Sequence, residues 1–101
     1  MTKKQLLTEH AIKLGNIIKD YRLALSLEKK SRQYFIDDRI NKQLLPEDWI
    51  SEKTLTNIEN GYNMPSLVTL KYLSIALEVD FLVLINAIEK YILPSENSNR
   101  N

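Results

Sequence analysis

The sequence predicts an all-helical protein, a five-helix bundle, and three observations support this prediction. The 101-residue chain contains only two glycines and almost no alternation of apolar and polar residues, the pattern of half-buried strands. Apolar residues recur instead every three or four positions, as on the buried face of a helix. A chain of this length can also bury one core but not two. We therefore expect one helical domain over residues 1–93 and a polar tail over residues 94–101, typical of a disordered segment or a linker.

The first predicted helix runs from Gln5 to Leu25. Its buried face consists of Leu7, Ala11, Leu14, Ile18, Tyr21 and Leu25. Gly15 weakens this helix without ending it. Ser26 can cap a second helix with its side-chain oxygen, and Ser31 can do the same. The second helix therefore begins at one of these two serines.

The second helix is expected to continue to about Asn41, because Ile36 and Ile40 lie one turn apart. Pro46 then lacks a backbone donor and favours an extended conformation in the residue before it. We therefore place a turn over Leu45 to Ile50 and expect Trp49 to be at least partly buried beside it.

Ser51 is expected to cap the third helix. Leu55 and Ile58 are three residues apart and would both point toward the core. Gly61 can adopt the left-handed conformation that ends a helix after Asn60. The sequence thus predicts a short helix of about nine residues with a polar outward side.

Two more helices complete the predicted bundle. The fourth begins at Pro65 and Ser66 and has a wide apolar side. This side consists of Leu67, Leu70, Leu73, Ile75, Ala76 and Leu77. The fifth runs from Phe81 to Leu93 and opens with consecutive apolar residues, which point in every direction around its axis. One side of the fifth helix must therefore be buried against something else.

Composition argues against several classes of protein. Hydrophobic residues make up 44% and charged residues 27% of the chain, as in soluble globular proteins. With no cysteine and one histidine, His10, we expect no thiolate metal site, no histidine-based triad, no cofactor and no enzyme activity. The chain lacks an apolar run typical of a signal peptide or a membrane span, so we expect a cytoplasmic protein.

The net charge of +1 does not distinguish a nucleic-acid binder from other proteins. Basic residues gather in residues 1–30, whereas the middle third of the chain is more acidic. This distribution fits either a basic face for nucleic acid or an ordinary solvated helix surface.

One set of residues is similar to a known family. The set comprises Leu14, Gly15, Ile18, Arg22, the segment Ile50–Gly61, Pro65, Ser66, Thr69, Leu70, Leu73, Ala76, Leu77 and Val79. It resembles the phage repressor and Cro-like helix-turn-helix family, also called the XRE family, over about Lys13 to Leu84. The resemblance implies a lambda-repressor-like fold in which the third helix lies in the major groove of DNA.

The resemblance also implies an ion pair between Arg22 and Glu59 that ties the first helix to the end of the reading helix. A carboxylate close to a core helix is costly unless a guanidinium meets it with bidentate geometry. The alternative is that the two residues are unrelated surface charges.

The chain departs from the family before the reading helix, where it is longer by about a dozen residues. The family's apolar pair in the second helix would fall at Lys30 and Ser31, which are unsuited to a core. Either that helix is rebuilt, or the alignment shifts so that Phe35 and Ile36 supply the pair, and we favour the shift. Closing the longer loop costs only about 1.2 kcal/mol in entropy. The added segment, Phe35–Asp48, forms an arm in this interpretation, and the arm contacts DNA, a protein partner or nothing.

By the same resemblance, Glu52, Lys53, Thr56 and Asn57 match positions that face base edges. Their side chains suit this role, because asparagine pairs with adenine, lysine donates to guanine, and glutamate accepts from cytosine. Contacts to DNA phosphates are expected from Ser51, Asn60, Tyr62, Asn63 and Ser66. The loop that holds most of these residues contains no lysine, which predicts weak nonspecific binding.

We therefore expect a sequence-specific double-stranded DNA-binding transcriptional regulator, most simply a repressor. Two alternatives remain open: an antitoxin of the same fold that also binds a cognate toxin, and a protein-binding module without DNA contact. We also expect a homodimer through Phe81–Ile92, which would place two reading helices about 34 Å apart. Packing within one domain core can also explain that apolar run.

Overall fold

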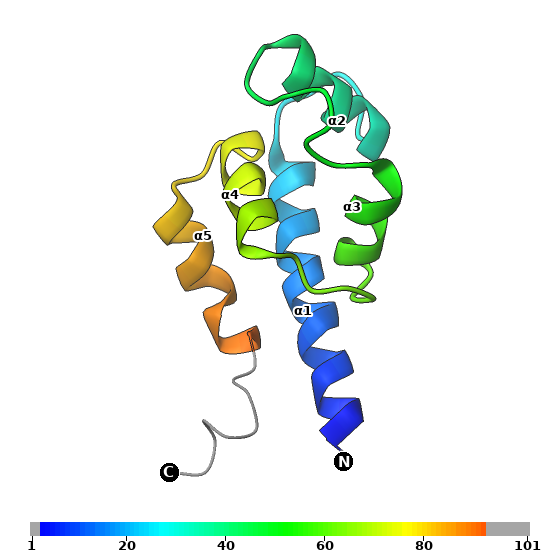
Figure 1. Cartoon of the computed structure of the whole chain (residues 1–101), viewed down its shortest axis with the longest axis vertical. Helices are drawn as coiled ribbons and strands as arrows, with labels where there is room; N and C mark the ends of the chain where they lie inside the picture. The colour runs from blue at the N-terminus through cyan, green and yellow to red at the C-terminus, as the bar shows by residue number, and fades with distance from the viewer. Residues whose placement is uncertain (1–2, 93–101) are drawn as a thin grey trace.

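The chain folds into five α-helices and a final 3₁₀ turn, in a computed structural model that describes residues 3–92, with side chains from residue 8 onward (Figure 1). The helices are α1 (Lys3–Ala24), α2 (Arg32–Asn41), α3 (Glu52–Glu59), α4 (Leu67–Ala76), α5 (Phe81–Ile88) and the 3₁₀ helix η1 (Glu89–Tyr91). Residues 3–92 contain no strand, so the predicted all-helical class is confirmed. The predicted tail, residues 94–101, lies outside the described residues.

Helix α1 runs along the molecule, with α3 on one side of it and α4 and α5 on the other (Figure 1). Its inward residues Leu14 and Ile18 are 1% and 0% exposed. Between them on the same side lies Gly15, and a Cβ built there would stand 2.3 Å from the carbonyl oxygen of Ile58 in α3. Only a residue without a side chain allows the backbones of α1 and α3 to come this close. Gly15 therefore determines the position of α3 on the domain.

The second helix begins after Ser31 and not after Ser26. The Ser31 hydroxyl accepts a hydrogen bond from the backbone amide three residues later, at 3.1 Å. The ammonium group of Lys30 donates to the carbonyl oxygens of Leu23 and Leu25, at 3.1 and 2.8 Å. These bonds satisfy carbonyls at the end of α1, which have no partner within the helix.

The added segment folds back onto the core and does not form an arm. Helix α2 has 10 residues, and Phe35 and Ile36 are 1% and 3% exposed, so these two residues are part of the core. After α2 the chain returns with Leu45 and Trp49 buried. The Trp49 ring meets the rings of Phe35 and Tyr72 edge-on, with centroids 5.9 and 6.5 Å apart. Aromatic packing of this kind buries a large apolar area, so the segment is part of the core.

A buried arginine joins α2 to the end of α4. Arg39 is 1% exposed, and its Nη1 donates to the carbonyl oxygen of Ala76 at 3.1 Å and to Glu78 Oε2 at 2.6 Å. Its Nε donates to Asp38 Oδ2 at 3.1 Å. The hydrogen bond from Arg39 lowers the pKa of the Asp38 carboxyl below its usual value. The ion pairs thus compensate the burial of the Arg39 charge.

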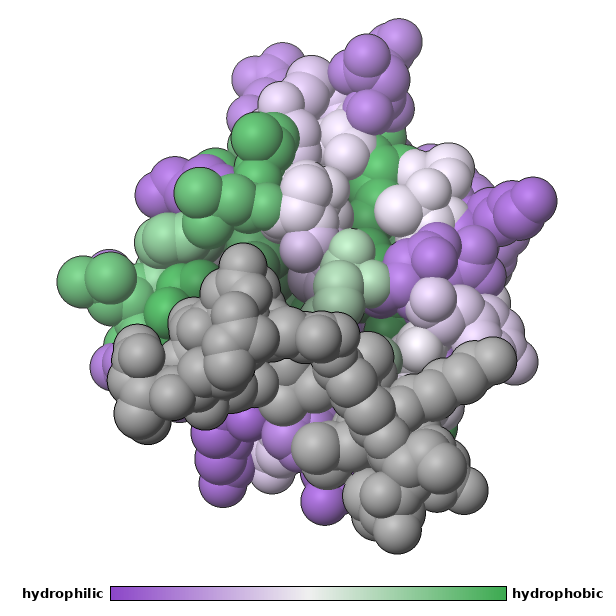
Figure 2. All heavy atoms as spheres, turned by 60° about the horizontal axis from the view of Figure 1, so that its bottom comes forward, coloured by the Kyte–Doolittle hydropathy of each residue, from purple (hydrophilic) through white to green (hydrophobic). Residues whose placement is uncertain are grey.

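The last two helices differ from expectation in two respects. Leu67 and Ile75, predicted on the buried side of the fourth helix, are 69% and 39% exposed. Hydrophobic residues gather at the surface on one side of the molecule (Figure 2). Leu67 and Ile75 point away from the side of α4 that carries Leu70 and Leu73, which face the core. Helix α5 ends at Ile88, before the predicted end at Leu93, a residue outside the described range. The chain tightens there into η1, which brings Tyr91 edge-on against His10 of α1.

Replacing Gly15 with alanine should destabilise the domain by about 1–3 kcal/mol, because the added methyl group forces α1 and α3 apart. This sign is opposite to the gain that alanine normally gives inside a helix. Urea unfolding followed by circular dichroism measures the change. The neighbouring exposed residue provides the control, since Asn16→Ala should leave the free energy of unfolding unchanged or raise it. A stabilising Gly15→Ala would contradict the close approach.

Asp38→Asn should lower the free energy of unfolding at pH 7, by removing the carboxylate that pairs with Arg39. Because the pKa of Asp38 is lower in the folded chain, its stabilising effect is complete above the unfolded value and is lost as pH falls through the folded value. The difference between variant and wild type should therefore shrink below about pH 4. Trp49 fluorescence during urea unfolding reports this segment. A pH-independent difference would mean that charge is not its cause.

Candidate nucleic-acid interface

Helix α3 begins and ends where the sequence predicts. The Ser51 hydroxyl accepts a hydrogen bond from the Thr54 amide at 3.0 Å, which caps the first turn. At the other end Gly61 has a φ of 82°, in the left-handed region. Leu55 and Ile58 are 0% and 2% exposed, so the apolar side of α3 faces the core. The opposite side is therefore presented to solvent.

The four residues predicted to read bases lie on this helix with different exposure. Glu52 and Lys53 in the first turn are exposed, whereas Thr56 and Asn57 in the second turn are half-buried. The backbone oxygen of Asn57 accepts bonds from Tyr62 and Asn63, so the following loop folds back over this turn. The four side chains make no hydrogen bond or ion pair with the described part of the chain. All four polar groups are thus available to a ligand, and the first turn protrudes furthest.

Two of the predicted phosphate-contacting residues already use their hydroxyl groups. The Ser51 hydroxyl also donates to Thr54 Oγ1 at 2.9 Å. The Ser66 hydroxyl accepts a hydrogen bond from the Thr69 amide at 3.1 Å and donates to Thr69 Oγ1 at 3.0 Å. Each serine hydroxyl therefore has no hydrogen left to donate to a phosphate. The groups at these positions that can still donate to a phosphate are the free backbone amides in the first turns of α3 and α4.

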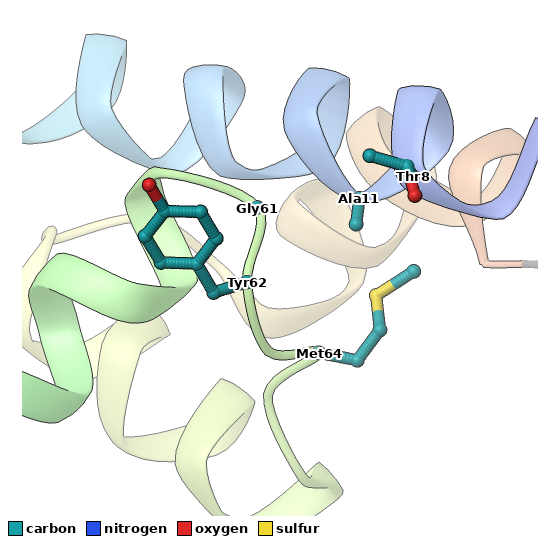
Figure 3. Close-up of a pocket in the computed structure, with 5 residues that line it drawn as sticks. All are labelled: Thr8, Ala11, Gly61, Tyr62 and Met64. Carbon is teal, nitrogen blue, oxygen red and sulfur yellow. The ribbon is translucent and has the colours of Figure 1, made fainter. Parts of the chain in front are cut away.

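The loop after α3 carries the other three predicted phosphate contacts. Asn60, Tyr62 and Asn63 are exposed, and Tyr62 is 74% exposed. The loop rests against α1, because a Cβ at Gly61 would lie 2.7 Å from Ile12. A hollow of about 240 Å³ lies between loop and helix (Figure 3). It is lined by Thr8, Ala11, Gly61, Tyr62 and Met64. Because these groups are mostly apolar and uncharged, the hollow does not suit an anion.

A buried carboxylate lies at the inner end of α3. Glu59 accepts two hydrogen bonds from Arg22, from Nε at 2.6 Å and from Nη2 at 2.8 Å. The two side chains are 0% and 4% exposed, respectively. Arg22 also donates through Nη1 to the carbonyl oxygen of Lys30 at 2.6 Å. The predicted ion pair is therefore present, with bidentate geometry, and it connects α1, α3 and the segment before α2.

A second arginine meets the same carboxylate, and the sequence analysis did not identify it. Arg32, the first residue of α2, donates from Nε to Glu59 Oε1 at 2.8 Å. Its side chain is 24% exposed, and its two terminal nitrogens have no partner among the described residues. Two cations on one carboxylate leave a positive charge beside α3. The available signal was a cation in the first turn of a helix, where the helix dipole disfavours it.

Comparisons with known proteins give no further information about this site. No family model, no curated protein and no solved structure matches the chain. Within the described residues, no group of three or more histidine, cysteine, aspartate or glutamate side chains could hold a metal ion. No helix in the same residues has the length and apolar character needed to cross a membrane.

Glu59→Gln should destabilise the domain by about 3 kcal/mol or more, because it leaves the buried Arg22 charge without an anion. The exposed residue Glu52 provides the matched control, and Glu52→Gln should change the free energy of unfolding by less than about 0.5 kcal/mol. Urea unfolding of both variants measures the two values. If both variants changed the free energy of unfolding by similarly small amounts, the charge of Glu59 would not contribute to stability.

Proposed function

We propose that the chain binds double-stranded DNA in a sequence-specific manner, with α3 in the major groove, and acts as a transcriptional regulator. The observation that carries this proposal is the outward side of α3, where four polar side chains have no partner within the described chain. A short helix of this kind fits a major groove about 12 Å wide. The resemblance to the phage repressor and Cro-like family supports the same reading, with a lambda-repressor-like fold. Occupying promoter DNA would make the protein a repressor.

Base recognition is assigned to the exposed side chains of α3. Lys53 and Asn57 lie one helical turn apart on the outward side, where lysine donates to guanine and asparagine makes paired bonds to adenine. Glu52 can accept from cytosine, and Thr56 offers a hydroxyl or a methyl group. Since Thr56 and Asn57 are half-buried, the groove edge must approach the second turn closely for them to read a base.

Contacts to the DNA backbone are assigned to two sets of groups. Asn60, Tyr62 and Asn63 offer polar groups next to α3, and the free amides that follow Ser51 and Ser66 can also bind phosphate oxygens. These groups position the helix without reading sequence. Arg32 adds a cation, held by Glu59 at the start of α2. With so few cations, nonspecific affinity and its dependence on salt should both be small.

The low charge of this surface favours one second candidate function. The net charge of the chain is +1, and Lys53 is the only cation in α3. A protein-binding module that uses the same side of α3 without DNA would need no more positive charge than Lys53 provides. An antitoxin of the same fold would bind both DNA and a protein partner, which is the toxin. Enrichment of one preferred sequence from a pool of random duplexes would favour the DNA-binding functions.

Selection of bound sequences from a random DNA pool should yield a preferred site, and Asn57→Ala should then lose about 1–3 kcal/mol of binding free energy there. The same variant should relax the choice at one base pair, because it removes paired bonds to one base. Fluorescence anisotropy with the selected duplex and single-base variants measures both effects. Asn41→Ala, at the exposed end of α2, is the matched control and should leave binding unchanged.

Arg32→Ala should behave differently and weaken binding to all sequences about equally, with a salt slope smaller by about one. Because Arg32 also binds Glu59, urea unfolding of the variant is measured alongside. With an unchanged free energy of unfolding, this pattern identifies a phosphate contact. If Asn57→Ala and Lys53→Ala both stay folded with unchanged affinity and unchanged sequence preference, α3 is not the reading helix. The segment Phe35–Asp48 would then be the next candidate for contacts to bases.

A further inference from the structure

Two exposed carboxylates precede the first turn of α3. Glu47 and Asp48 belong to the added segment, which leads directly into this turn (Figure 1). Both side chains are exposed, and neither forms an ion pair or a hydrogen bond within the described part of the chain. Two negative charges therefore stand without compensation next to the end of α3 that protrudes furthest.

The turn that carries these carboxylates is held in place. Its ends are joined by a hydrogen bond from the Trp49 amide to the Pro46 carbonyl oxygen, at 3.2 Å, and Glu47 and Asp48 are the two residues between them. The flanking side chains of Leu45 and Trp49 are 7% and 5% exposed, so both are anchored in the core. The two carboxylates consequently keep their position relative to α3.

The length of the chain limits how far the turn can lie from α3. Asp48 precedes Glu52, the first residue of α3, by four positions, so their Cα atoms are at most about 14 Å apart. When α3 lies in a major groove, phosphates border the groove on both sides of its first turn. Charges within a Debye length of a phosphate, about 8–10 Å, are only partly screened by salt. The two carboxylates are therefore close enough to repel these phosphates.

Nearby cations do not offset the two carboxylates. Residues 43–60 contain one cation, Lys53, and Glu52 beside it is a further exposed carboxylate without a partner in the described chain. The cation that precedes this range, Lys42, is itself paired with Asp38, with 3.3 Å between Nζ and Oδ2. The surface around the first turn of α3 is thus negative, opposite to the charge that most DNA-binding surfaces carry.

We propose that Glu47 and Asp48 limit the affinity of the α3 surface for DNA of every sequence, by repelling the phosphates that border the groove. This inference rests on the proposed function, because it requires α3 to lie in the groove. Phosphates are the same at every base pair, so the repulsion carries no sequence information. Firm binding then depends on the base contacts of α3, which only a preferred site supplies.

The double variant Glu47→Gln with Asp48→Asn tests the repulsion. One charge about 10 Å from one phosphate changes a binding constant by about twofold in water, so removing two carboxylates near several phosphates should strengthen binding by about fivefold at about 50 mM salt. The gain should be equal for the selected duplex and a random-sequence duplex, and it should fall to about twofold at about 200 mM salt. Fluorescence anisotropy with labelled duplexes measures these affinities, and urea unfolding establishes that the fold is kept.

A second double variant, Asp20→Asn with Glu89→Gln, is the matched control. Both carboxylates are exposed and have no partner within the described chain. Asp20 lies on the side of α1 away from Gly15 and Arg22, which face α3, and Glu89 lies on η1, which contacts α1 and α5. Either double variant removes two negative charges and raises the net charge from +1 to +3. The control should bind DNA within about twofold of the wild type.

Equal gains from the two double variants would overturn the proposal, because net charge and not position would then be the cause. An unchanged affinity of the Glu47→Gln/Asp48→Asn variant would also overturn it, and so would a gain confined to one sequence. In each of these results the wild-type chain still selects a preferred site, so DNA recognition by α3 stands. If neither the wild type nor the variant binds any duplex, both this proposal and the proposed function are wrong.

Discussion

Glu59 places a carboxylate where α1, α2 and α3 meet, and two arginines approach it from different helices. Arg22 binds it from α1 with two hydrogen bonds, and Arg32 binds it from the first turn of α2. A carboxylate that is 0% exposed is tolerable only with such partners. The cluster consequently fixes the direction of α3 relative to both earlier helices. Whatever α3 does on its outward side depends on this charge cluster on its inward side.

Two glycines complete the attachment of α3. Gly15 lets the backbone of α1 come against the carbonyl groups of Ile58 and Glu59, at one side of the helix. Gly61 ends the helix in a left-handed conformation and brings the following loop against Ile12. Helix α3 has only eight residues, too short to be stable alone, so its order comes from these contacts. A short helix held along one side and at its end leaves the other side free for a ligand.

The added segment shows how a helical domain accommodates extra residues without losing its core. Loop-closure entropy rises slowly with length, so the cost of the insertion is small. Burial of Trp49 against Phe35 and Tyr72 offsets that cost, and Arg39 connects the segment to the end of α4.

The sequence by itself determined the features that depend on neighbouring residues. Ser51 and Gly61 delimit α3, and the spacing of Leu55 and Ile58 orients it, because caps and helical period involve residues within one or two turns. The positions of the candidate reading residues on α3 followed from the same local rules. The Arg22–Glu59 pair came from the family resemblance and not from local pattern.

Only the tertiary structure decided which of two equivalent local signals is used. Ser31 and not Ser26 begins α2, where Arg22 of α1 donates to the Lys30 carbonyl and Arg32 meets Glu59 of α3. Arg32 joins Glu59 across 27 positions of the chain, and Arg39 meets Ala76 across 37. No local spacing contains such pairs. They arise when the packing of apolar faces brings distant segments together, and burial then makes a partner necessary for each charge.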